Sequence, residues 1–94
     1  MGQGVGVQGH RYALVVDDSS AQRMILTRFL RKWGYVTVEA SSGRDALARV
    51  AECYFDLILS DWMMPEMDGI DFCRAFRARA AQRYSYFILL TSKK

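Results

Sequence analysis

The sequence predicts an α/β fold in which an open parallel sheet carries helices on both faces. Two observations lead to this prediction. Short apolar segments alternate along the chain with longer segments whose apolar residues recur at helical spacing, and short connections join them. The first apolar segment is a continuous run, as expected for a strand that is covered on both faces. Right-handed crossovers between parallel strands then require helices on both sides of the sheet.

Four strands are expected. In chain order they are Tyr12 to Val16, Tyr35 to Ala40, Phe55 to Ser60 and Tyr86 to Leu90. The second is weaker than the others and contains Glu39, which is typical of a strand at the edge of a sheet.

The first helix is expected between the first two strands. Ser19 and Ser20 can cap its start, and Gly34 ends it as the first residue beyond the helix. Its broad apolar stripe consists of Ala21, Met24, Ile25, Leu26, Phe29, Leu30 and Trp33.

Two further helices follow the second and third strands. Ser42 and Asp45 resemble a capping box at the start of the second helix, with Asp in place of Glu. The residues expected to point inward from this helix are Ala46, Leu47 and Val50. Asp68 caps the third helix. One face of that helix is expected to carry Ile70, Cys73 and Phe76.

Composition indicates one small domain of a cytoplasmic protein. Ninety-four residues with 51% apolar content are enough for a single core, and no apolar run is long enough to cross a bilayer. Residues 1–10 are expected to be a flexible leader or cloning remnant, because they are glycine-rich and lack the regions of a secretory signal. Cys53 and Cys73 indicate reduced core thiols rather than a disulfide framework.

Charge and histidine content exclude several function classes. The only histidine, His10, lies in the leader, which excludes His-based triads, His-rich metal sites and an internal phosphohistidine. The net charge is +3, and the arginines of the first and third helices favour solvated outer faces over a nucleic-acid surface. Neither direct nucleic-acid binding nor a membrane partner is expected.

Polar residues follow three of the four expected strands. Asp17 and Asp18 follow the first, Asp61 the third and Thr91 the fourth. Since parallel strands end at one edge of the sheet, three carboxylates meet where the strand order reverses, if strands one and three are neighbours. They repel one another, and a hard cation such as Mg²⁺ offsets this while leaving positions for phosphate oxygens. Each residue alone also suits a cap or a turn, but their shared place favours a binding site.

The segments LVVDDSS, LILSDWMMPEMDG and FILLTS, in this order and spacing, resemble the receiver domain of two-component response regulators. The resemblance covers about residues 11–94. Its most specific part is the D-x-x-x-P-x-x-D-G pattern behind a buried strand, with an acidic pair earlier in the chain. It implies a flavodoxin-like sheet of strand order 2-1-3-4. Pro65 and Gly69 would shape the tight loop that carries Asp61 out of its strand.

The resemblance implies a signalling switch rather than a turnover enzyme. Asp61 would accept a phosphoryl group from the phosphohistidine of a sensor histidine kinase or phosphotransfer protein. Asp18, Asp61 and the backbone carbonyl of Met63 would bind Mg²⁺, with Asp17 acting largely through water. Thr91 would hydrogen-bond a phosphoryl oxygen and draw its loop inward. The side chain of Met63 would shield the phosphoryl group from water.

The sequence departs from the family's pattern at its C-terminal end. In the family a further helix, a fifth strand with a pocket lysine and a last helix follow, and none of them is found after Leu90. Lys93 and Lys94 stand too close to Thr91 to replace that lysine. Residues 11–94 are therefore interpreted as a C-terminally truncated receiver domain of a longer protein. The output domain would lie beyond this chain, and the motifs are similar to those of receivers fused to diguanylate cyclases or kept in hybrid kinases.

Truncation has structural consequences. The fourth strand is expected to be an exposed apolar edge, and part of the first helix, including Ile25, Phe29 or Leu30, loses its cover. A homodimer or an element-swapped oligomer is consistent with both.

Three alternative functions compete with phosphotransfer. A pseudo-receiver would keep the fold as an interaction or dimerisation module without phosphotransfer. A phosphatase with an aspartyl phosphate intermediate needs a carboxylate two residues after the nucleophile, where Met63 stands. A flavodoxin-like cofactor binder needs a Ser-, Thr- or Gly-rich phosphate loop after the first strand, and the acidic pair stands there instead.

Overall fold

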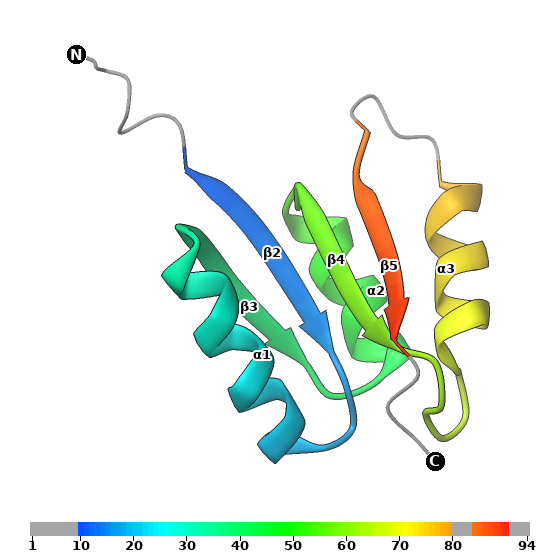
Figure 1. Ribbon diagram of the computed structural model, residues 1–94. Helices are drawn as coiled ribbons and strands as arrows, with labels where there is room; N and C mark the ends of the chain where they lie inside the picture. Colours follow the sequence, from blue (N-terminus) through cyan, green and yellow to red (C-terminus); the bar gives the residue numbers. More distant parts are fainter. Residues whose placement is uncertain (1–9, 80–83, 91–94) are drawn as a thin grey trace.

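The computed structural model describes residues 10–79 and 84–90. In this part of the chain a parallel sheet has the strand order β3-β2-β4-β5. Counted along the described strands this order is 2-1-3-4, so the predicted fold class and strand order are confirmed. Figure 1 shows the arrowheads of the strands, and hence their carboxyl ends, together at the lower edge of the sheet.

The strands lie close to their predicted ranges. They are β2 (Arg11–Val16), β3 (Tyr35–Ala40), β4 (Leu57–Asp61) and β5 (Tyr86–Leu90). Only β4 differs by more than one residue, since it begins after Asp56 and takes in Asp61. Phe55 is nevertheless buried, because it packs in the apolar core. Asp56 ties this segment to both neighbouring strands, since the Asp56 N–H donates to the Tyr12 carbonyl at 2.8 Å and the Asp56 carbonyl accepts from the Tyr86 N–H at 3.0 Å.

Helix α1, Ser20–Lys32, lies on one face of the sheet (Figure 1). Ser19 is its N-cap, and the Ser19 hydroxyl accepts from the Gln22 N–H at 3.2 Å. Gly34 follows the C-cap residue Trp33 with a left-handed φ of 93°, as predicted for the residue that ends the helix.

Helices α2, Gly43–Glu52, and α3, Gly69–Ala78, cover the opposite face. Ser42 caps α2, as predicted, by accepting from the Asp45 N–H at 3.0 Å. The reciprocal bond of a capping box is not formed, because Asp45 Oδ2 accepts from the N–H of Ser41, the residue before the cap. Cys53, the C-cap residue of α2, is exposed, so the interpretation of a core thiol is wrong there.

The buried face of α3 differs from the prediction. Phe76 is buried as expected, but its partner is Phe72, whereas Ile70 and Cys73 are only half-buried. The reason is tertiary, since Phe87 of β5 lies 5.1 Å from Phe72 and 5.8 Å from Phe76 between ring centroids. The aromatic pair one turn apart therefore faces the sheet.

Two apolar cores sandwich the sheet. The core under α2 and α3 is the larger and contains Leu14, Val16, Ala40, Ala46, Val50, Phe55, Ile58, Met64, Phe72 and Phe76. The core under α1 contains Ala13, Val15, Leu30 and Leu59. Successive residues of β2 alternate between the two cores, as the pleat requires. The central strands are thereby held from both faces, which fixes the position of their carboxyl ends.

Apolar side chains remain exposed on α1 and on β5 in the described part of the chain. They are Met24, Ile25 and Phe29 of α1, its C-cap residue Trp33, and Tyr86, Ile88 and Leu89 of β5. The predicted loss of cover is confirmed for Ile25 and Phe29, which are 51% and 57% exposed. It is wrong for Leu30, which packs into the core under α1. None of the described helices has the length and apolar character to span a bilayer.

Candidate functional site

An acidic pocket lies at the carboxyl ends of β2 and β4. These two strands are hydrogen-bonded neighbours, with Val16 opposite Ser60, so the residues that follow them emerge side by side. Asp61 is the last residue of β4, while Asp17 and Asp18 follow β2 directly. The chain leaves β2 for β3 on one side and later returns to β4 on the other, so the strand order reverses here. Open α/β sheets bind their ligands at such a point.

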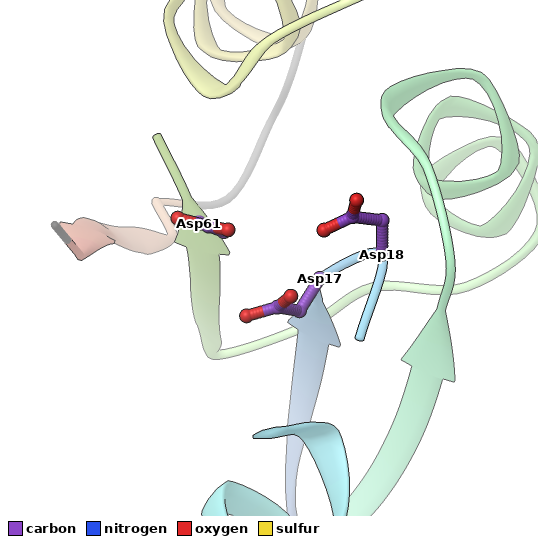
Figure 2. Close-up of side chains that lie close together, drawn as sticks. All are labelled: Asp17, Asp18 and Asp61. Carbon is purple, nitrogen blue, oxygen red and sulfur yellow. The ribbon is translucent and has the colours of Figure 1, made fainter. Parts of the chain in front are cut away.

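The three predicted carboxylates come together. One carboxylate oxygen from each of Asp17, Asp18 and Asp61 lies within 4.8 Å of the other two. Figure 2 shows the three side chains turned toward a common space beyond the strand ends. Asp17 and Asp61 are buried, at 2% and 1% exposed, whereas Asp18 is exposed. A set of hard oxygen donors, two of them buried and one open to solvent, fits Mg²⁺ or a similar cation.

Hydrogen bonds from α1 and its N-cap, and to the end of β3, hold Asp17 in place. Its Oδ1 accepts from the Ser19 N–H at 2.9 Å, and its N–H donates to the Ala40 carbonyl at 3.1 Å. Arg23 Nη1 donates to the Asp17 carbonyl at 2.7 Å, and its Nε contacts Glu39 Oε1 at 2.8 Å. The sequence placed Arg23 among the arginines of a solvated outer face, and this interpretation is wrong for Arg23, whose side chain is only 16% exposed. No local pattern could have shown this, because its partners lie on β3 and on the loop after β2.

The loop after β4 closes tightly on Asp61. The N–H of Met63 donates to Asp61 Oδ1 at 3.3 Å, and the N–H of Gly69 donates to the Trp62 carbonyl at 2.9 Å. A Cβ atom on Gly69 would lie 2.4 Å from the Asp61 carbonyl oxygen and 3.0 Å from Trp62 Cα. Only glycine permits this approach, which explains the glycine that ends the D-x-x-x-P-x-x-D-G pattern.

The remaining loop residues divide into buried and exposed positions. Met64 is buried in the core under α2 and α3, an anchoring role that sequence reasoning missed because the residue stands outside any periodic segment. Trp62 and Met63 are 41% and 55% exposed beside the pocket. Glu66 adopts a left-handed φ of 66°, uncommon for a residue with a side chain. Thr91 lies outside the described residues, so its predicted role stays a prediction.

The chain combines an open parallel sheet with an acidic pocket at the point where the strand order reverses, the place where open α/β proteins bind their ligands. A family model, the response regulator receiver domain, matches residues 13–94. The chain belongs to this family.

Individual relatives agree with this assignment. The transcriptional regulatory protein ResD of Bacillus subtilis is 42% identical over 80 residues, which are 85% of this chain and 32% of ResD. The chain therefore spans about a third of that relative's length. The chemotaxis protein CheY4 of Vibrio cholerae matches with a TM-score of 0.84 at 34% identity, over 92% of this chain and 72% of that one. The response regulator TrrA of Thermotoga maritima, in complex with Mg²⁺-BeF, matches with a TM-score of 0.80 at 30% identity, over 88% and 70%.

Proposed function

We propose that this receiver domain accepts a phosphoryl group on Asp61 and acts as a switch in a two-component signalling pathway. The observation that carries the proposal is the meeting of the Asp17, Asp18 and Asp61 carboxylates within 4.8 Å in a chain of the receiver family. Asp61 ends β4, the strand between β2 and β5. The residue after it, Trp62, is hydrogen-bonded to both β5 and the start of α3.

In the proposed step an Asp61 carboxylate oxygen attacks the phosphorus atom of a phosphohistidine on a donor protein. The oxygen–phosphorus bond forms while the nitrogen–phosphorus bond breaks, and the electron pair of that bond leaves with the imidazole, which takes a proton from solvent. The carboxylate is itself the nucleophile, so no hydroxyl or thiol proton has to be removed by a general base. Met63 contributes by orienting the carboxylate through its N–H.

Mg²⁺ is the proposed cofactor. Asp18, Asp61 and the Met63 carbonyl would hold it, with Asp17 acting largely through water, since carboxylate and carbonyl oxygens are the ligands that Mg²⁺ prefers. The thioether of Met63 is too soft to be a ligand. When bound, the ion supplies positive charge that offsets the carboxylates and the transferring phosphoryl oxygens. The Mg²⁺-BeF complex of TrrA supports this assignment.

A backbone hydrogen bond between the pocket loop and β5 supports a switching role. The Trp62 N–H donates to the Leu90 carbonyl at 2.9 Å, so the residue after Asp61 is tied to the last described residue of β5. Thr91 comes next in the sequence and is the proposed partner of a phosphoryl oxygen. Drawing Thr91 inward would move the end of β5, which is the expected output signal.

The proposed partners follow from the family. The donor is a sensor histidine kinase or a phosphotransfer protein, and both would meet this domain in the cytoplasm. An output domain beyond this chain receives the signal. A diguanylate cyclase output remains a prediction from sequence similarity alone, as do the truncated domain boundary at residues 11–94 and the leader at 1–10.

Intact-mass measurement after brief incubation with Mg²⁺ and acetyl phosphate tests the proposal. The expected result is a single phosphoryl adduct, absent without Mg²⁺ and absent in Asp61→Asn. The control variant is Asp71→Asn, an exposed aspartate of α3 outside the pocket, which should be labelled like the wild type. A folded wild type that gains no adduct would refute phosphotransfer to this chain.

The second candidate is an interaction module without phosphotransfer. The exposed apolar side chains of α1 and those of β5 favour it, because exposed apolar patches mark protein–protein contacts. Sedimentation of wild type and Asp61→Asn distinguishes the two candidates. Self-association that is equal in both proteins, together with the absence of labelling, would assign the chain to this second class.

A further inference from the structure

The start of helix α2 packs against the loop that follows Asp61. A Cβ atom on Gly43, the first residue of α2, would lie 2.8 Å from Met67 Cγ, 2.9 Å from Met67 Sδ and 2.9 Å from the Met67 carbonyl oxygen. A methionine side chain can move aside at small cost, but a backbone carbonyl cannot move without its loop. Gly43 is also buried, so this contact is closed to solvent.

Other contacts hold both the start of α2 and the loop at Met67 in place. The start of α2 is fixed by its Ser42 cap and by Ala46, which is fully buried in the core. Met67 packs against the same core, and Met64 is buried in it. At its other end the loop is closed by Gly69, whose missing side chain lets it approach the Asp61 carbonyl.

We infer that Gly43 is a positioning residue for the acidic pocket, acting through Met67 on the loop that presents Met63 and orients Asp61. The inference rests on the proposed function, in which the Met63 carbonyl is a ligand of Mg²⁺. Two close glycine contacts hold residues 62–68. Gly43 of α2 lies against Met67, and Gly69 lies against the Asp61 carbonyl at the end of β4. A side chain at position 43 displaces the loop at Met67. Only residues 64–66 separate Met67 from Met63, and the loop cannot relax at Gly69, which is packed against the Asp61 carbonyl, so the displacement reaches Met63.

Two alanine variants separate positioning from stability. In Gly43→Ala the backbone conformation is not left-handed, so the added methyl group acts through the contact with Met67 alone. Gly34→Ala is the control, because its φ of 93° strains any side chain while nothing lies within 4 Å of the added atom. Both variants should lower Tm, but Gly34 lies beyond the end of α1, away from the pocket.

The experiment is an NMR titration of ¹⁵N-labelled wild type, Gly43→Ala and Gly34→Ala with MgCl₂. Gly43→Ala is expected to shift the Trp62 and Met63 amide resonances before Mg²⁺ is added and to weaken Mg²⁺ binding by about tenfold. Gly34→Ala should leave both unchanged. Resonances and affinity in Gly43→Ala equal to those of Gly34→Ala would overturn the inference.

Two further arms complete the test. If Gly43→Ala does not fold, Met67→Ala is compared with the double variant Gly43→Ala/Met67→Ala, because these two proteins differ only in the clash between the added Cβ atom and the backbone at position 67. Equal Mg²⁺ affinity in the two would overturn the inference. A folded wild type that does not bind Mg²⁺ would refute the proposed metal site itself, and the inference would fall with it. The two failures are therefore distinguishable in the same titration.

Discussion

Replacing Asp61 with asparagine should make the metal-free domain more stable. One carboxylate oxygen from each of Asp17, Asp18 and Asp61 lies within 4.8 Å of the other two. Two unit charges at that distance repel by about 3.5 kcal/mol at an effective dielectric constant of about 20. The Asp61→Asn substitution removes the charge from two of the three pairs, while it retains the shape of the side chain and an acceptor for the Met63 N–H.

The net gain in stability is smaller than the sum of the repulsion energies of the two pairs. Solvent around the exposed Asp18 screens one pair, so we expect a rise of about 2 kcal/mol in the free energy of unfolding. In a domain of this size each kcal/mol moves Tm by about 4–8 °C, so Tm should rise by about 10 °C. The order of stability reverses at a Mg²⁺ concentration of about a hundredfold its Kd, because the ion then stabilises the wild type by about 2.7 kcal/mol and the variant lacks one of the proposed ligands.

Circular dichroism melts of both proteins, with Mg²⁺ and with EDTA, measure these quantities. Asp71→Asn is again the control. Asp71 is exposed in the first turn of α3, so the loss of its charge is expected to lower stability by about 0.3–1 kcal/mol, opposite in sign to the effect predicted for Asp61→Asn. A lower Tm for Asp61→Asn in EDTA would refute the reasoning that the carboxylates repel. An equal Mg²⁺ effect in wild type and variant would show that the ion binds elsewhere.

Three further predictions concern the loop, the core and the exposed surface. Gly69→Ala should cost about 3 kcal/mol in urea unfolding and abolish Mg²⁺ binding, because its Cβ meets the Asp61 carbonyl; unchanged stability would contradict the close approach. Phe72→Ala should cost about 3–5 kcal/mol, since its ring is fully buried against Phe87, and a midpoint close to that of the wild type would show that α3 packs otherwise. Phe29→Ala, at a 57% exposed position, should shift the urea midpoint little but reduce self-association in sedimentation; unaltered association would exclude this surface as the contact.

Local sequence patterns were sufficient for the elements and for the identity of the pocket carboxylates. Caps at Ser19, Ser42 and Asp68 start the three helices where they were predicted, because a capping side chain bonds only to the next turn of its own chain. The parallel strands end at one edge of the sheet, so Asp17 and Asp61 were expected to meet if β2 and β4 were neighbours. The resemblance to receiver domains implied that strand order, and the structure has it.

Contacts between segments decided which face of α1 and of α3 is buried and how the pocket residues are supported. The face that α3 turns inward was set by Phe87, a residue of the next strand, and no periodicity within α3 could distinguish Phe72 from Cys73. Leu30 is buried and Phe29 exposed because the sheet lies on one side of α1 only. The support of Asp17 by Arg23 and the contact of Gly43 with Met67 join residues from different elements. Sequence by itself thus determined which groups the domain brings to the pocket, since these follow from short-range bonding and strand direction. Tertiary structure decided how those groups are held, since that depends on packing between segments far apart in the chain.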